Sequence, residues 1–164
     1  MALVPITHGV EESVKEIYAL ADKPGIKGIM IPTMWHDAES YGHEKYDPIW
    51  QACHETGLVV HTHSGEADAE AYNENMAQYM LEVAFWTHRP LWQFLLSGKF
   101  DKYPNFKYVP VECGSWWLGD LLWKTDVMFG GTNWKVKKMS SRTKGLIERL
   151  PSEYVGENVF IGAS

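Results

Sequence analysis

The sequence lacks the features that mark several large classes of protein. No stretch approaches the roughly 18 uncharged apolar residues of a membrane-spanning helix, and residues 1–6 hold no basic region of the kind that begins a signal peptide. Basic residues are too few for a nucleic-acid surface, because 15 Lys and Arg face 21 Asp and Glu and the net charge is −6. We therefore expect a cytoplasmic protein that binds neither nucleic acid nor membrane.

Cysteine and glycine motifs are scarce as well. The 2 cysteines, Cys53 and Cys113, form no C-x-x-C pair, which excludes a disulfide-stapled scaffold and fits a reducing compartment. The turn after the first apolar run, residues 7–9, reads Thr-His-Gly, and no Walker sequence occurs anywhere. These absences argue against a dinucleotide-binding or P-loop fold.

The composition that remains is that of a globular domain. Of the 164 residues, 45% are hydrophobic and 22% are charged, which is ordinary for a soluble protein and a suitable length for one domain. An aromatic content of 13% argues against disorder. Since no linker, repeat or low-complexity tract is present, we expect a single domain over residues 1–164.

Short apolar runs alternate with helical patterns along the chain. Strands that are nearly all apolar are typical of a sheet buried on both faces, and crossover helices between them make the sheet parallel. The sequence therefore predicts an α/β fold, with a local irregularity at Pro110 because proline cannot donate to a strand ladder. Strands are expected at residues 2–6, 26–31, 58–62, 106–111 and 158–161, and helices at residues 10–21, 47–55, 66–84, 90–97, 116–127 and 142–150.

The segment Val-Val-His-Thr-His-Ser-Gly, residues 59–65, is the most informative one for function. Side chains alternate along a strand, so His61 and His63 share one face at its carboxyl end. Parallel-sheet enzymes place their chemistry at that edge, and neutral imidazole is the commonest metal ligand. His63 is the candidate metal ligand and His61 a candidate substrate contact; the competing interpretation is a pair of hydrogen-bonded core histidines.

Glu112 ends the next apolar run, just before Cys113 and Gly114. A carboxylate in such a place binds a cation, works as a general acid or base, or pairs with a basic group, because burying it alone is costly. We take Glu112 as the candidate catalytic residue, with a structurally paired glutamate as the alternative.

Two tryptophans that follow strand ends are candidate substrate-binding walls. Trp116 comes directly after the Glu112 strand, and Trp35 lies in the loop after residues 26–31. Aromatic rings at such positions line pockets for apolar or aromatic ligands. Ordinary core packing is the alternative for Trp116 and its neighbour Trp117.

Four stretches together resemble one known family. Residues 47–65 look like its helix and strand ending in a metal-site histidine, and residues 89–107 contain its G-x-F-x-x-x-P passage; residues 111–117 and 151–161 look like later strand ends. The sequence thus resembles the amidohydrolase-related family of metal-dependent barrel enzymes, which includes aminocarboxymuconate-semialdehyde and resorcylate type decarboxylases. The likeness covers nearly the whole chain.

The resemblance implies a partial (β/α)8 TIM barrel with roughly strands two to six or seven. The sequence would then be an internal piece of a longer barrel. It implies that His63 binds a divalent metal, zinc or manganese, and gives His61 no fixed role. Glu112 stands where many members have a histidine that helps in proton transfer. The implied activity is hydrolysis or non-oxidative decarboxylation of a small aromatic or unsaturated acid, so the partner is a small-molecule substrate.

An alternative of another class is a catalytically incomplete barrel that acts only as a binding or subunit module. An opened barrel exposes two unpaired strand edges, which invite pairing, so a homo-oligomer joined at those edges is one expectation. Stoichiometric metal in the purified protein distinguishes the enzyme from the module.

Overall fold

The computed structural model describes residues 2–3, 9–33, 39–64, 75–130 and 147–162. Within them, four strands form a parallel sheet in the order β1-β2-β3-β4, so each strand lies beside its neighbour in the sequence. A doubly wound sheet would reverse its order at a switch point, and the described strands show no such reversal. The predicted parallel α/β arrangement is confirmed. The strands are β1 (Ala2–Leu3), β2 (Gly28–Met30), β3 (Val59–His63) and β4 (Tyr108–Val111).

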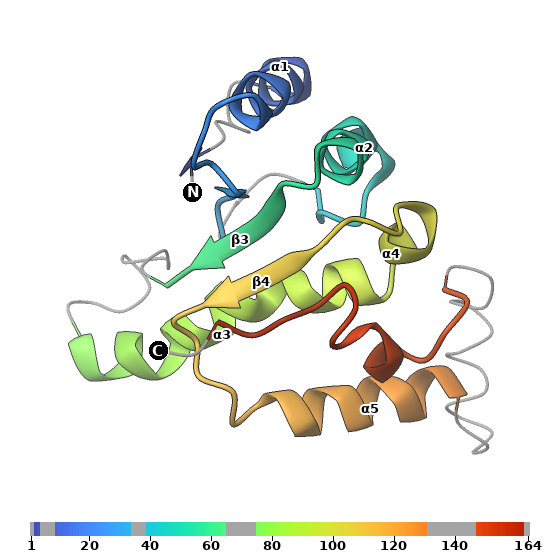
Figure 1. The fold of residues 1–164 in the computed structure, drawn as a ribbon. Coiled ribbons are helices and arrows are strands. Elements are labelled where there is room, and N and C mark those ends of the chain that lie inside the picture. The colour runs from blue at the N-terminus through green and yellow to red at the C-terminus, as the bar shows by residue number, and fades with distance from the viewer. Residues whose placement is uncertain (1, 4–8, 34–38, 65–74, 131–146, 163–164) are drawn as a thin grey trace.

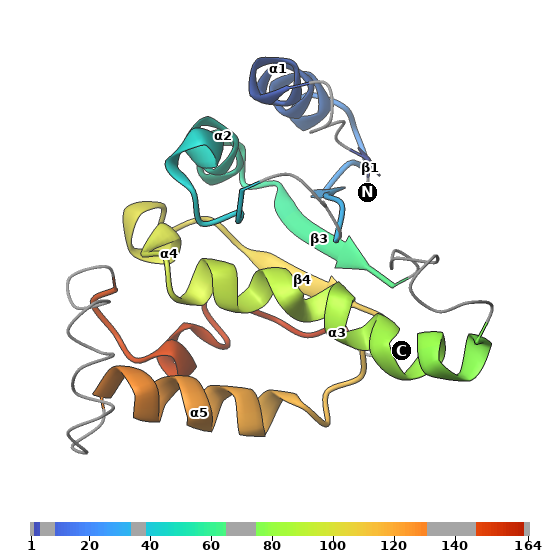
Figure 2. The same ribbon diagram turned by 180° about the vertical axis from the view of Figure 1, so that it is seen from behind.

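Helix α3 covers one face of β3 and β4. Helix α3 runs behind β4 in Figure 1 and in front of it in Figure 2, while α1 and α2 lie along the other margin. Of the described helices, none crosses the opposite face of β3 and β4. The bounds are α1 (Val10–Ala21), α2 (Asp47–Thr56), α3 (Met76–Leu95), α4 (Lys99–Lys102) and α5 (Leu118–Gly130), with short 3-10 helices η2 (Glu44–Tyr46) and η4 (Pro151–Tyr154).

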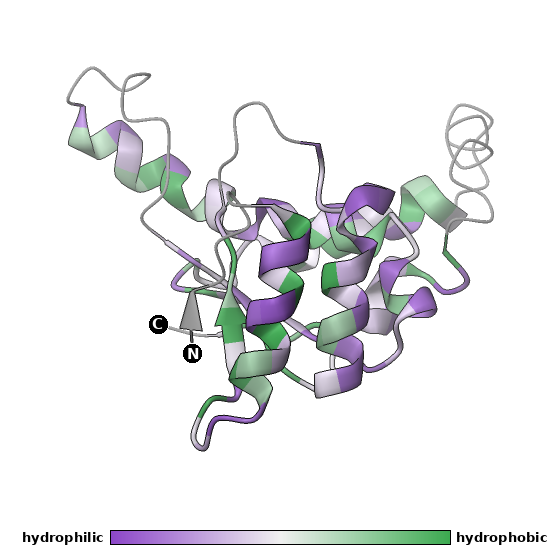
Figure 3. Cartoon of the chain, turned by 90° about the horizontal axis from the view of Figure 1, so that it is seen from above, coloured by the Kyte–Doolittle hydropathy of each residue, from purple (hydrophilic) through white to green (hydrophobic). Residues whose placement is uncertain are grey.

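The first two long helices begin at the predicted residues. Helix α1 spans the predicted residues and buries Ile17 and Leu20, and α2 lies beside it with hydrophobic and hydrophilic residues mixed along its length (Figure 3). Gly57 ends α2 with a left-handed φ of 71°, which glycine adopts without a steric penalty. Asp47 is the first helical residue of α2, and its carboxylate forms salt bridges with Lys99 and Lys102.

Two helix predictions are corrected by the structure. The patterns before and after Pro90 belong to one helix, α3, which contains Pro90 in its interior. An interior proline costs about 3 kcal/mol, and the complete burial of Leu91, Phe94 and Leu95 offsets it. Of the helix predicted at residues 142–150, the described part, residues 147–150, is not helical. Residues 66–74 lie outside the described part of the chain.

The segment predicted as a fifth strand runs parallel to β4 but makes only isolated bridges, Tyr108 to Val159 and Val111 to Gly162. Its backbone bonds run from Tyr108 N to Asn158 O, from Phe160 N to Tyr108 O and from Gly162 N to Pro110 O. Between them the ladder needs an N–H from Pro110, which proline does not have. The irregularity predicted at this proline is therefore a missing backbone hydrogen bond between β4 and residues 158–162.

An aromatic core lies between α2, α3 and the sheet. The indole of Trp50 packs edge-on against Phe94 and stacks on Phe106, with ring centroids 4.9 and 5.2 Å apart, and Phe94 also contacts Tyr108 of β4. All four rings are fully buried. This core anchors β3 and β4 against α3 and so fixes the edge where the candidate site residues lie. None of the described helices is long and apolar enough to span a membrane.

Candidate functional site

Alternation along β3 separates two sets of side chains, as the sequence predicts. Val60 and Thr62 are fully buried, whereas His61 and His63 are half-buried on the other face. The Thr62 hydroxyl donates to the Thr87 carbonyl of α3 at 2.7 Å and lies 2.6 Å from the Tyr108 hydroxyl. Thr62 therefore faces the helices, and His63 faces the side of the sheet that no described helix covers.

His63, Ser64 and Glu112 meet at the carboxyl ends of β3 and β4. The His63 Nε2 lies 3.4 Å from Glu112 Oε2, and the Ser64 hydroxyl donates to that same oxygen at 2.8 Å. The His63 Nδ1 lies 2.8 Å from the Ser64 carbonyl oxygen. Since a carbonyl only accepts, Nδ1 carries a hydrogen, and in the neutral ring the lone pair of Nε2 points toward Glu112.

The backbone at Glu112 has an unusual conformation. Its φ is 56°, the left-handed region, and it is the one described residue other than glycine with a positive φ. Such a conformation costs about 1–2 kcal/mol for a residue with a Cβ, and strain of this kind clusters at functional sites. The neighbouring Cys113 thiol is buried, which raises its pKa to about 11. Cys113 is therefore protonated at neutral pH.

His61 does not join this group. Its Nδ1 lies 3.0 Å from the Val59 carbonyl oxygen and 3.2 Å from that of Ile29, so the ring leans back along β3, away from the carboxyl edge. It lies over Gly28 of β2, where an added Cβ would come within 2.6 Å of His61 Cε1. Gly28 is thus the residue that makes room for the imidazole.

The tryptophans considered as substrate-binding walls differ in how exposed they are. Trp116 is 82% exposed, so it lines no described cavity, whereas Trp117 is buried and its ring stacks on His88 with centroids 3.7 Å apart. Trp35 lies outside the described residues. Burial lowers the pKa of His88 to about 4, and its Nδ1 has no hydrogen-bond partner among the described residues.

The donor atoms of His63 and Glu112 fit a shared cation. Two acceptor atoms that face each other need a positive charge between them, either a proton or a metal ion. Ligands of one tetrahedral metal ion at about 2.1 Å lie roughly 3.4 Å apart, and Nε2 and Oε2 have that separation. A backbone acceptor on the other imidazole nitrogen is the usual support of a metal-binding histidine. Among the described residues no third His, Cys, Asp or Glu side chain joins these two.

Comparison with known proteins identifies the family of this chain. The amidohydrolase family model matches residues 1–140. The chain belongs to the amidohydrolase family. Of the curated proteins, none matches the sequence.

Solved structures of this family have the same fold as the chain. An amidohydrolase from Mycobacterium avium subsp. paratuberculosis K-10 is 20% identical, with a TM-score of 0.74 over 99% of this chain and 41% of its own. The 5-carboxyvanillate decarboxylase of Novosphingobium aromaticivorans, solved with manganese, is 23% identical, with a TM-score of 0.76 over 99% of this chain and 46% of its own. A dihydroxybenzoic acid decarboxylase from Polaromonas sp. JS666, also with manganese, is 17% identical, with a TM-score of 0.71 over 94% of this chain and 47% of its own. The chain therefore spans less than half the length of each.

Sequence reasoning missed two contributors to the site. Ser64 contacts both His63 and Glu112, and its position directly after the H-x-H pattern was the available signal. Gly28 gives His61 its space, but an isolated glycine in a strand pattern signals close packing without naming the neighbour.

Proposed function

We propose that the protein containing this chain is a metal-dependent carboxy-lyase that removes CO2 from a small aromatic acid without oxidation. The observation that carries the proposal is the approach of His63 Nε2 to Glu112 Oε2 at 3.4 Å, at the carboxyl ends of adjacent parallel strands. A sequential parallel sheet with helices on one side is what part of a (β/α)8 barrel presents, and barrel enzymes hold their active sites at this edge.

His63 and Glu112 would hold the metal from this part of the protein. Bound there, a divalent cation would fix the carboxylate and hydroxyl groups of the substrate and withdraw charge from them. The Ser64 carbonyl keeps the His63 ring in the tautomer that offers Nε2. Manganese in two similar solved structures, both decarboxylases, supports a divalent metal of this kind.

Glu112 is suited to move the proton that decarboxylation requires. When the bond between the ring carbon and the carboxylate breaks, its electron pair stays on the carbon, which must then take a proton. Glu112 Oε2 is held by Ser64, while Oε1 has no partner among the described residues and would orient the water that gives its proton to the ring carbon. The hydroxide left by that water would combine with the released CO2 as bicarbonate. Its side chain is 48% exposed, so solvent reaches it.

The proposal is tested by measuring CO2 release from 2,6-dihydroxybenzoate and 5-carboxyvanillate with the metal-free and the manganese-loaded protein. We expect release only with metal, and a loss of about 100-fold or more in Glu112→Gln. Hydrolysis of a small amide or lactone by the same metal-loaded protein, with no CO2 from either acid, would assign it to the hydrolases. A folded protein that binds no metal and turns over neither kind of substrate would be the non-enzymatic module.

A further inference from the structure

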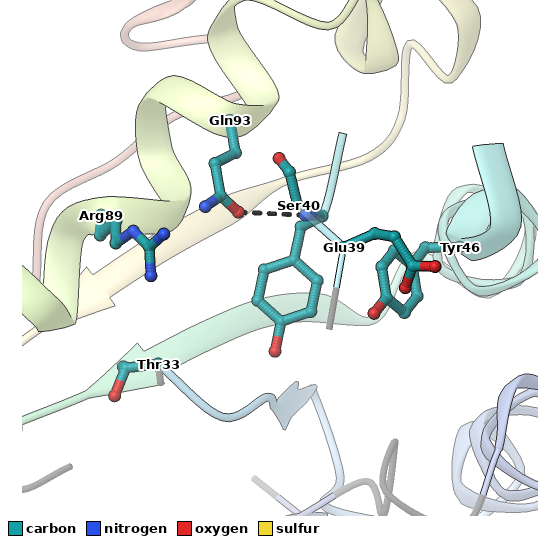
Figure 4. Close-up of a pocket in the computed structure, with 7 residues that line it drawn as sticks. Thr33, Glu39, Ser40, Tyr46, Arg89 and Gln93 are labelled. Atoms are coloured by element: carbon teal, nitrogen blue, oxygen red, sulfur yellow. Dashed lines mark hydrogen bonds between the residues drawn. The ribbon is translucent and has the colours of Figure 1, made fainter. Parts of the chain in front are cut away.

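A polar cavity lies on the other side of the sheet from His63. It has a volume of about 70 Å³ and lies between α3 and the segment that leads into α2. Figure 4 shows Arg89 and Gln93 reaching from α3 toward Glu39 and Ser40. Because α3 packs on the Thr62 side of β3, this cavity shares no residue with the His63 and Glu112 site. Its lining consists of Thr33, Glu39, Ser40, Tyr41, Tyr46, Arg89 and Gln93.

Arg89 is the positive charge of this cavity. Its side chain is half-buried and its guanidinium lies 5.5 Å from the centre of the Trp86 ring, but it forms no salt bridge with any described carboxylate. Arginine is seldom buried without a counter-ion, because removing its charge from water is costly. The planar guanidinium matches the paired oxygens of a carboxylate or phosphate. An anion is therefore the ligand that Arg89 fits.

The polar neighbours of Arg89 are oriented to donate. The Tyr41 backbone N–H donates to Gln93 Oε1 at 3.0 Å, which fixes the amide so that its NH2 group is the end left to bind a ligand. The Ser40 hydroxyl oxygen accepts from Gly42 N at 3.3 Å, which leaves its hydrogen available. Two neutral donors therefore lie around the same cavity as the guanidinium.

The one described carboxylate in the lining is already neutralised. Glu39 Oε2 lies 2.6 Å from Lys45 Nζ, and this hydrogen bond lowers the Glu39 pKa. The pair carries no net charge, so Arg89 decides the sign of the cavity. The cavity floor is held in place by Tyr41, whose hydroxyl donates to the Pro32 carbonyl at 2.6 Å and whose own carbonyl accepts from Trp50 Nε1 at 3.0 Å.

We propose that this cavity is a second ligand site, which binds a small oxyanion through Arg89, Gln93 and Ser40. Drug-sized ligands need about 300–1,000 Å³, so about 70 Å³ admits a single carboxylate or phosphate group rather than a whole substrate. The site does not depend on the metal or on the reaction at His63 and Glu112. Its ligand is either inorganic phosphate or the carboxylate of a small acid.

The test titrates inorganic phosphate and, separately, acetate into the metal-free protein at constant ionic strength, with chloride as the balancing ion. Binding is followed by the NMR signal of the Arg89 Nε–H group and by Tm. We expect a saturable shift of that signal and a higher Tm with at least one of the two anions, and the tighter binder identifies the source. In Arg89→Gln the apparent Kd should rise about tenfold or more.

Two further variants keep the test decisive. Gln93→Leu removes a neutral donor and should weaken binding with Arg89 intact, which serves if Arg89→Gln does not fold. Lys27→Gln removes one exposed positive charge that is not part of the lining and should bind as the wild type does. An Arg89 signal that neither anion moves, or equal Tm shifts in wild type, Arg89→Gln and Lys27→Gln, would overturn the proposal.

Discussion

The imidazole of His63 and the carboxylate of Glu112 approach to 3.4 Å across two neighbouring parallel strands. Both groups belong to the edge where β3 and β4 end, and Ser64 contacts each of them. Normal hydrogen bonds between nitrogen and oxygen are about 2.7–3.2 Å long, so the separation of this pair leaves room for a shared cation, either a proton or a metal ion.

Ser64 should act as a positioning residue for Glu112. Ser64→Ala removes the hydroxyl that donates to Glu112 Oε2 but keeps the backbone carbonyl that holds His63. Changes to such supporting groups typically cost 10- to 100-fold in metal affinity, so we expect manganese binding about tenfold weaker by calorimetry, with unchanged stability. Ser64→Thr keeps a hydroxyl and should restore affinity. Equal affinity in Ser64→Ala and wild type would show that the hydroxyl positions nothing.

The left-handed backbone conformation at Glu112 should be lower in free energy for glycine than for a residue with a Cβ. With φ at 56°, a residue with a Cβ is strained by about 1 kcal/mol or more relative to glycine. Glu112→Gly should therefore unfold in urea with a free energy about 1 kcal/mol higher than Glu112→Ala, although both lose the carboxylate. If Glu112→Ala is the more stable of the two, the left-handed conformation is absent in solution.

Gly28 should be intolerant of even one methyl group. A Cβ there would lie 2.6 Å from His61 Cε1 and 2.6 Å from the Val59 carbonyl oxygen. We expect Gly28→Ala to lower the free energy of unfolding by about 1–3 kcal/mol and to shift the His61 ring signals in NMR spectra.

The matched control is Gly119, in α5, where an added Cβ meets nothing within 4 Å. Alanine is a better helix former than glycine by up to about 1 kcal/mol, so Gly119→Ala should be neutral or stabilising. Equal losses in the two variants would remove the case for a close approach at Gly28.

His88 should make the protein sensitive to acid. Burial lowers its pKa from 6.5 to about 4, so between these values the unfolded chain binds more protons than the folded one, and stability falls as the pH drops. Above pH 6.5 this effect is absent. From pH 7 to pH 5 the loss is roughly 2 kcal/mol.

His88→Phe should remove that loss while keeping a ring against Trp117. We expect the free energy of unfolding, measured in urea, to drop from pH 7 to pH 5 in both proteins. The drop should be roughly 2 kcal/mol larger in the wild type than in the variant. Parallel pH profiles for the two proteins would mean that His88 is accessible to protons in the folded state.

Much of the fold could be predicted from the sequence because local patterns decide it. The 3.6-residue period located α1 to the residue, and the alternation of β3 placed His61 and His63 on one face. Pro90 misled the prediction, because the burial of Leu91 and Phe94 in the core overrides the local cost of proline. That burial depends on contacts far apart in the sequence, which a local pattern does not contain.

The candidate site was predictable in part for the same reason. His63 and Glu112 end consecutive strands, and parallel strands bring their carboxyl ends to one edge. The direction of each ring was not predictable: His61 turns toward the Val59 and Ile29 carbonyls, while His63 turns toward Ser64. The anion site proposed at Arg89 was not predictable either, because the cavity forms only where the segment around Ser40 lies opposite α3 in the fold.

Manganese binding by a matched pair of histidine variants tests the metal site most directly. The chelator-treated protein is titrated with Mn²⁺ by calorimetry in three forms: wild type, His63→Ala and His61→Ala. His63 offers Nε2 beside Glu112, and His61 leans away, so stoichiometric binding should be lost in His63→Ala and retained in His61→Ala. Stoichiometric binding that persists in His63→Ala would contradict the assignment of this imidazole as a ligand.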